Sequence, residues 1–293
     1  MNRPPPFHAG ALLPHEWIFG GFFLVQWLRL LWLDGPADPD ACAYLALLLV
    51  NGAMLASCGW HPTPARWQVR LWFYPVVMNL VFFTMHSAIL KVAPHPCDAA
   101  LRAIDEWCFG ALLSVRAQTI ASPVLTEVMS LCYLVLFPYL LISWIDCARR
   151  GPHLLRRLSV GLFSIYGLGF LGYSLVPAAG PHLAFPDQFG GPLRGWAITA
   201  FNARVVAGGS NGVDVFPSLH CAVTAFLLHF DRRHSPRRFR WLVVPCAGLW
   251  LATVYLRYHY FIDVLAGFAL AAFGCWLTDR RAEWQILRHR SLS

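Results

Sequence analysis

Long apolar runs recur along the whole chain, and they constrain the fold more than any other feature of the sequence. A run of about 18 or more apolar residues is typical of a helix that crosses the hydrocarbon core of a bilayer. The sequence therefore predicts an all-α fold, a polytopic membrane helical bundle with about eight spans. The expected spans are residues 16–33, 41–58, 71–92, 125–147, 154–176, 216–231, 241–257 and 260–278.

Composition excludes a water-soluble globule and argues against nucleic-acid binding. Of 293 residues, 57% are hydrophobic and 13% are charged, which is about half the charged fraction of an ordinary soluble domain. The net charge of +8 would favour nucleic acid in a soluble protein, but here the arginines lie in short loops between apolar runs. There they are expected to fix the topology and to contact anionic lipid head groups. The expected partners are membrane lipids, with no nucleic acid and no protein partner.

The arginines alternate along the chain in a way that predicts its orientation. Every second connection is rich in arginine, as expected for loops on the cytoplasmic side. Both termini are therefore expected in the cytoplasm. The long Gly- and Pro-rich connection 177–215 should lie on the opposite side, and its length indicates a functional loop. The arginines that carry this argument are Arg66, Arg70, Arg149, Arg150, Arg156, Arg157, Arg232, Arg233, Arg237, Arg238, Arg240, Arg280, Arg281, Arg288 and Arg290.

The segment Phe216–Ala222, with the sequence Phe-Pro-Ser-Leu-His-Cys-Ala, lies at the start of a predicted span. Pro217 suits the first position of a helix, where its missing N–H is not needed. The free N–H groups of that first turn and the helix dipole favour a bound phosphate. Ser218 adds a hydroxyl donor, and His220 should lie about one turn into the helix, beside the anion.

A second segment, Tyr255–Gly267, contains His259 and Asp263, four residues apart. On a helix this spacing places both side chains on one face. Asp263 could then accept a hydrogen bond from one imidazole nitrogen and leave the other nitrogen basic. The alternation of spans puts His220, His259 and the 177–215 loop on the same, non-cytoplasmic side, as one shared site requires.

The pairing of Pro-Ser-x-His with His-x-x-x-Asp resembles the type-2 phosphatidic acid phosphatase superfamily. The two segments are most similar to its inositol phosphorylceramide synthase branch, the aureobasidin target. Weaker similarities to that branch lie at Ile104–Gly110 and Tyr173–Pro181, and the resemblance covers roughly residues 100–270. It implies a six-helix phosphatase-like core.

The resemblance also implies roles for individual residues. His259 would be the nucleophile and form a phosphohistidine, Asp263 would orient it, and His220 would protonate the leaving oxygen. Ser218 and nearby backbone amides would hold phosphate oxygens. The chemistry of this family needs no metal and no cofactor.

The chain departs from the phosphatase pattern where that pattern binds phosphate. Leu219 replaces a glycine, and Ala252-Thr253 replaces a Ser-Arg pair, so the family arginine is missing. The first motif has no clear match, although Gly180-Pro181-His182 carries a histidine where an arginine could be expected. Since guanidinium groups bind phosphate in a bidentate way, the remaining candidates are Arg194, Arg204 and Arg257. These departures favour a lipid phosphotransferase over a plain phosphatase.

Three parts are expected along the chain. Residues 1–100 should form N-terminal membrane spans, 101–278 the phosphatidic acid phosphatase-like catalytic membrane domain, and 279–293 a basic cytoplasmic tail. Residues 101–116 mix large apolar side chains with charges and should form an interfacial helix.

Other functions stay open at this stage. They are a plain lipid-phosphate phosphatase, a metal-dependent lipid hydrolase that uses the same histidines as ligands, and a non-enzymatic lipid carrier. Asp214 is expected to be a loop or capping residue. The stretch 208–212, Gly-Gly-Ser-Asn-Gly, is expected to be a flexible turn rather than the site of a serine nucleophile.

Overall fold

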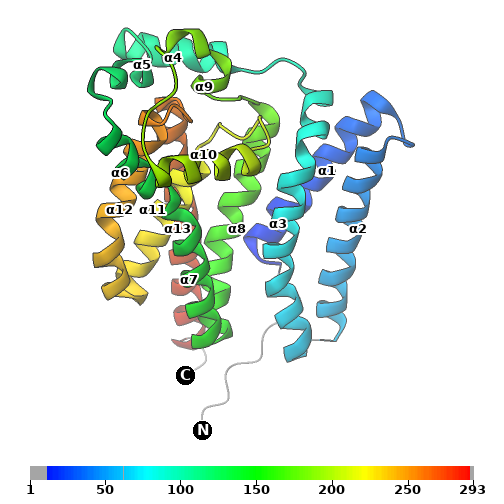
Figure 1. Ribbon diagram of the computed structural model, residues 1–293. Coiled ribbons are helices and arrows are strands. Elements are labelled where there is room, and N and C mark those ends of the chain that lie inside the picture. The colour runs from blue at the N-terminus through cyan, green and yellow to red at the C-terminus, as the bar shows by residue number, and fades with distance from the viewer. Residues whose placement is uncertain (1–11, 62, 291–293) are drawn as a thin grey trace.

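The computed structural model describes residues 12–61 and 63–290, with the side chains of 281–290 left out of the description. Within these ranges every regular element is a helix, and the β pairing is limited to one isolated bridge between Ala178 and Asp214. The predicted all-α polytopic bundle is confirmed (Figure 1). The long helices are α1 (Pro14–Asp34), α2 (Pro39–Trp60), α3 (Pro64–Val92), α6 (Pro123–Leu134), α7 (Leu136–Arg150), α8 (Pro152–Leu175), α11 (Leu219–His234), α12 (Pro236–Tyr255) and α13 (Phe261–Arg290).

Each predicted span falls on a helix, but the spans differ in length and apolarity. Five helical stretches are long and apolar enough to cross a bilayer: α2, α3, α6 together with α7, α8, and residues Phe261–Arg280 of α13. The remaining three spans fall on α1, α11 and α12. α11 has 16 residues, and α12 opens with an arginine-rich turn, which explains their weaker apolar signal.

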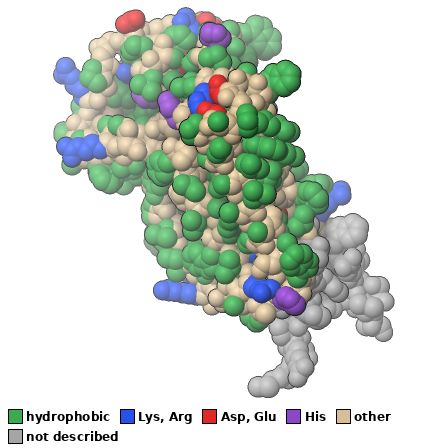
Figure 2. Space-filling view, turned by 90° about the vertical axis from the view of Figure 1, so that its right-hand side faces the viewer, with side chains coloured by type: hydrophobic (Ala, Val, Ile, Leu, Met, Phe, Trp, Pro, Cys, Tyr) green, Lys and Arg blue, Asp and Glu red, His purple; other side chains and the backbone are tan. Residues whose placement is uncertain are grey.

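The helix boundaries follow from local chemistry. Proline occupies the first turn of most long helices, where its missing N–H costs nothing. Side chains of Asp38, Thr63 and Ser122 accept hydrogen bonds from the first turns of α2, α3 and α6. On the face that Figure 2 shows, the surface between the two ends of the bundle is largely hydrophobic, and the charged side chains lie toward the ends. Val244 and Val76, for example, are 75% and 68% exposed, as lipid-facing side chains would be.

One part of the prediction was wrong in detail. The expected helix 101–116 is two helices, α4 (Asp98–Phe109) and α5 (Leu113–Ala117), because the chain turns at Gly110 with a left-handed φ of 73°. The connection 177–215, which is too long for a plain connector, contains two helices, α9 (Pro181–Ala184) and α10 (Ala197–Gly209). The predicted tail 279–293 continues α13 as far as Arg290, and its last three residues lie outside the described residues.

The connections between the helices lie at the two ends of the bundle. α4, α5, α9 and α10 cover one end, while the short turns α2–α3, α7–α8 and α11–α12 lie at the other (Figure 1). The start of α11 and the start of α13 both lie under the covered end. The arrangement brings the two sequence motifs to the same end of the molecule.

Candidate active site

The first motif opens α11 in a way that differs from the prediction. Pro217 does not occupy the first helical position; Ser218 is the N-cap, and the helix begins at Leu219. The Ser218 hydroxyl accepts a hydrogen bond from the Cys221 N–H at 3.4 Å, so it caps the helix. His220 is therefore at the second helical position, next to the free N–H groups of the first turn.

The second motif is a corner rather than one helical face. α12 ends at Tyr255 and α13 begins at Phe261, so His259 lies in the connection between them. The N–H groups of Tyr258 and His259 both donate to the Thr253 carbonyl at 3.0 Å, which fixes the corner. The predicted pair still forms, because the His259 Nδ1 lies 3.5 Å from Asp263 Oδ2. That is an ion-pair distance, longer than an ordinary hydrogen bond.

Backbone contacts join the two motifs directly. The Ser218 N–H donates to the Asp263 carbonyl at 3.0 Å. Gly267 allows this approach, because a Cβ there would lie 2.5 Å from the Ser218 carbonyl oxygen. A side chain at Gly267 would therefore push α13 away from the start of α11.

The two predicted histidines face each other across this junction. The ring centroids of His220 and His259 are 6.0 Å apart, close enough for one phosphate to contact both rings. His259 is 4% exposed. The His220 Nε2 has no hydrogen-bond partner among the described residues, and the His259 Nδ1 has only the Asp263 carboxylate, at 3.5 Å. Buried polar atoms are nearly always paired, so the unpaired His220 Nε2 indicates a place for a polar ligand.

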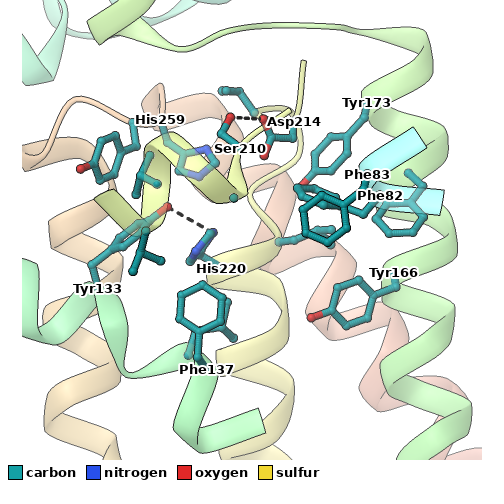
Figure 3. Close-up of a pocket in the computed structure, with 18 of the residues that line it drawn as sticks. Phe82, Phe83, Tyr133, Phe137, Tyr166, Tyr173, Ser210, Asp214, His220 and His259 are labelled. Carbon is teal, nitrogen blue, oxygen red and sulfur yellow. Dashed lines mark hydrogen bonds between the residues drawn. The ribbon is translucent and has the colours of Figure 1, made fainter. Parts of the chain in front are cut away.

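Tyr133, on α6, completes this group and was not predicted. Its ring stacks on His220 with centroids 4.4 Å apart, and its hydroxyl lies 3.4 Å from the His220 Nδ1 (Figure 3). These contacts hold the imidazole in one orientation and leave its Nε2 facing the ligand space. A tyrosine inside an apolar run gives no sequence signal for such a role.

A cavity of about 290 Å³ lies in front of the two histidines. Its apolar wall comes from α3, α7 and α8, with Phe83 and Phe137 at the outer edge, 64% and 49% exposed. Among the described lining residues there is no lysine or arginine. Figure 3 shows the aromatic side chains gathered around this space. The cavity thus joins imidazole groups at its inner end to a hydrocarbon-like wall.

Asp214 and His182 are two further polar members of the cavity lining. Asp214 lies in the loop before α11, one of the two places expected for it. It accepts a hydrogen bond from the Ser210 hydroxyl at 2.6 Å, and burial raises the pKa of its carboxyl. Burial also lowers the pKa of His182, so that this ring is neutral near pH 7. Ser210 lies at the end of α10 as the donor to Asp214, which differs from the flexible turn expected for 208–212.

Two carboxylates on α4 hold the site in place from outside. Asp105 accepts from the N–H groups of Phe261 and Ile262, at 2.7 and 3.1 Å, and so caps α13. Asp98 accepts from Gly180 N–H at 2.9 Å and from the Tyr260 hydroxyl at 2.8 Å. Sequence reasoning missed both roles, although Asp105 falls within one of the weaker similarities, Ile104–Gly110.

The three predicted phosphate-binding arginines do not line the histidine cavity. Arg257 and Arg194 line neighbouring cavities at the same end of the bundle. Arg204 is exposed on α10. The structure brings together His220, His259, Asp263 and Ser218, and it leaves these arginines outside their immediate contacts.

The sequence model of the PAP2 superfamily matches residues 99–277, well over half of the chain. The chain belongs to the PAP2 superfamily. No curated protein and no solved structure matches the chain. PAP2 proteins are phosphoesterases, and this membrane-embedded PAP2 protein is accordingly an enzyme of the lipid phosphatase or phosphotransferase kind. Within the described residues no three His, Cys, Asp or Glu side chains are grouped to hold a metal ion.

Proposed function

We propose that this PAP2 protein transfers or hydrolyses a phosphoryl or phospho-head group of a membrane lipid through a phosphohistidine on His259. The observation that carries the proposal is the meeting of His220 and His259, from distant motifs, at 6.0 Å at the inner end of one apolar-walled cavity. A lipid can place its phosphate at the imidazoles while its hydrocarbon chain lies along the aromatic wall.

The chemistry follows from the positions of the two rings. The Nδ1 of His259 faces Asp263, so Nε2 is the nitrogen that attacks phosphorus. As the N–P bond forms, the bond from phosphorus to the lipid oxygen breaks, and His220 gives its proton to that oxygen. Water or an alcohol then attacks phosphorus, the N–P bond breaks, and His220 takes the proton of the acceptor. General acid–base help of this kind typically contributes about 10²–10⁴-fold.

Transfer to a lipid alcohol is the finer proposal, with hydrolysis as the alternative outcome. It rests on the similarity of the two motifs to inositol phosphorylceramide synthases, and on a histidine cavity whose described lining contains no lysine or arginine. A phosphate monoester carries two negative charges and a phosphodiester carries one, so the monoester depends more on a cation in the cavity to compensate its charge. A phosphodiester lipid is therefore the better donor for this cavity.

The catalytic domain is assigned to residues 101–278. The spans within residues 1–100 contribute one wall of the histidine cavity. Met78, Asn79, Phe82 and Phe83 of α3 line the cavity although they precede the family region. The N-terminal spans are therefore assigned a part in holding the lipid chain.

We place the active site on the non-cytoplasmic side, with both termini cytoplasmic, from the alternation of arginine-rich connections. Cys108 is exposed on α4 at the end that carries the site. A membrane-impermeant maleimide added to intact cells should label wild type and not Cys108→Ser at this position. Labelling of Cys108 only after the membrane is opened would reverse the assigned orientation.

The test of activity is mass spectrometry of lipids after incubation of the purified protein with mixed phospholipids, ceramide and diacylglycerol. A new pairing of head group and lipid indicates transfer, and released head-group phosphate indicates hydrolysis; both should vanish in His259→Ala. Full activity in the presence of a chelator is expected, and loss of activity would favour the metal-dependent hydrolase. Lipid flux across vesicles without any product would favour the carrier.

A further inference from the structure

A second cavity lies beside the histidine cavity, on the far side of Tyr258. It has a volume of about 440 Å³ and is lined by Arg257, Asn202, Thr199, Ser130, Tyr258 and His182 among others; we call it the arginine cavity. Tyr258 and His182 line both cavities, so the two spaces are neighbours. A substrate that spans both would have one group at the histidines and another at Arg257.

Arg257 is a buried cation without a carboxylate. Its side chain is 8% exposed, and among the described residues no carboxylate lies within ion-pair distance. One guanidinium N–H donates to the Gly191 carbonyl at 2.8 Å, and the group stacks on Phe189 at 4.2 Å. The Nε remains without a partner. Because an uncompensated buried charge is costly, the site is complete only with an anion or a strongly polar oxygen.

Asn202 supplies the complementary unpaired group. It is 1% exposed, and its Nδ2 donates to the Tyr258 hydroxyl at 3.1 Å. Its Oδ1 has no hydrogen-bond partner among the described residues. The arginine cavity therefore presents one unpaired donor, on Arg257, and one unpaired acceptor, on Asn202.

The backbone at Arg257 is arranged to keep its side chain there. Arg257 has a φ of 69°, the left-handed region that non-glycine residues seldom adopt. The His182 N–H donates to its carbonyl at 3.0 Å. His259 is two residues further along the same corner, so the turn sends His259 to one cavity and Arg257 to the other.

We propose that the arginine cavity is a subsite for a polar substituent that carries both an anionic oxygen and a hydroxyl donor, distinct from the reacting phosphate at His259. The anionic oxygen pairs with Arg257, and the hydroxyl donates to the Oδ1 of Asn202. This rests on the proposed function for the identity of the neighbouring site. The substituent belongs either to the head group of the lipid or to a free polar alcohol phosphate that enters from water.

Binding can be read without turnover from thermal unfolding in detergent, with phosphatidylglycerol phosphate or free glycerol 3-phosphate as the probe. The lipid carries, beside its reacting phosphodiester, a terminal phosphate and a hydroxyl, and glycerol 3-phosphate is the same group in free form. Wild type should be stabilised by at least one probe, and Arg257→Gln should lose most of that shift. Arg116→Gln, an exposed arginine on α5 at the same end, is the matched control and should keep it. A shift with phosphatidylglycerol phosphate alone assigns the subsite to a lipid head group, and a shift with glycerol 3-phosphate assigns it to a soluble group.

Selectivity gives a second readout. Arg257→Gln should raise KM for phosphatidylglycerol phosphate by about 10–100-fold and leave turnover of phosphatidic acid, which has no further substituent, within about 3-fold. Arg257→Lys should restore part of the loss, because it keeps the charge but not the planar fork. Asn202→Ala, on α10 and away from the corner, should show the same selectivity change if Arg257→Gln disturbs folding.

Three results would overturn the subsite. They are no stabilisation of wild type by either probe, a shift that survives both Arg257→Gln and Asn202→Ala, or an equal loss of turnover for phosphatidylglycerol phosphate and phosphatidic acid. Failure of the proposed function can be told apart from failure of the subsite. In that case turnover would not depend on His259, while the thermal shift that depends on Arg257 would persist.

Discussion

Buried polar groups have different partners in two regions of the molecule. One region is the N-terminal helices α1 to α3, and the other is the end of the bundle that carries the proposed active site, called here the catalytic end. Glu16 on α1 and Arg70 on α3 are both nearly inaccessible and form a two-pronged pair, with N–O distances of 2.5 Å. At the catalytic end, the Nε2 of His220 and the Nε of Arg257 are also buried, but neither has a hydrogen-bond partner among the described residues, and each residue lines a cavity. A closed pair can only support packing, whereas open groups can bind a ligand.

This contrast separates stability from activity along the chain. α1 to α3 precede the family region, and their buried ion pair fixes one helix against another. The catalytic end lies within the family region and holds its imidazoles beside a cavity. Substitutions in the first region should therefore change unfolding, and substitutions in the second should change turnover.

The largest expected effect is on turnover in the histidine cavity. His259→Ala and His220→Ala should each lower kcat at least about 10³-fold, because they remove the proposed nucleophile and the proposed proton donor. His229→Ala, on the same helix as His220 but at the opposite end of the bundle, is the control and should stay near wild type. Rates measured with a lipid substrate in detergent, together with thermal unfolding, separate the two effects. Near-normal turnover in either His259→Ala or His220→Ala would contradict the catalytic role proposed for that histidine.

The next largest effect is on stability in the N-terminal helices. Glu16→Gln leaves Arg70 buried beside a neutral amide and should lower the free energy of unfolding by about 3–5 kcal/mol. kcat of the remaining folded protein should change little. Thermal unfolding in detergent measures the loss, and the double variant Glu16→Gln with Arg70→Met should recover part of it. A variant with normal stability and lost turnover would contradict the separation of the two regions.

A smaller effect is expected where a contact only orients a catalytic group. Tyr133→Phe keeps the stacking on His220 and removes a hydroxyl that lies 3.4 Å from Nδ1. kcat should fall by about 10-fold or less, since a weak hydrogen bond is worth about 1 kcal/mol. The pH profile of kcat should also move, because the hydroxyl acts on the titrating imidazole. An unchanged profile and rate would remove Tyr133 from the site.

The smallest expected effect concerns α3, the one N-terminal helix discussed here that also lines the histidine cavity. Phe83→Ala should raise KM for long-chain lipids by about 2–5-fold, because it removes apolar contact at the cavity edge. Turnover of a short-chain phospholipid should be unchanged. Val76→Ala, an equally exposed apolar change on the same helix outside the cavity, is the control. Equal effects on short and long chains would restrict substrate binding to the family region.

The sequence by itself determined the helical membrane fold and the two motifs. Apolar runs predict spans because a bilayer admits only long, internally hydrogen-bonded segments, and all the predicted spans fall on helices. The same pattern does not show that residues 197–209 form a helix in the Gly- and Pro-rich connection, or that Gly110 divides the helix predicted over 101–116.

Only the tertiary structure decided how the site is assembled. Spacing suggested one helical face for His259 and Asp263, but the pair forms across a corner that is fixed by the Thr253 carbonyl and capped by Asp105. Tyr133 and Asn202 carry no local signal, because their roles depend on which distant helix lies opposite. Local chemistry sets where helices begin and which faces are apolar, whereas the meeting of two imidazoles depends on packing between segments far apart in the chain.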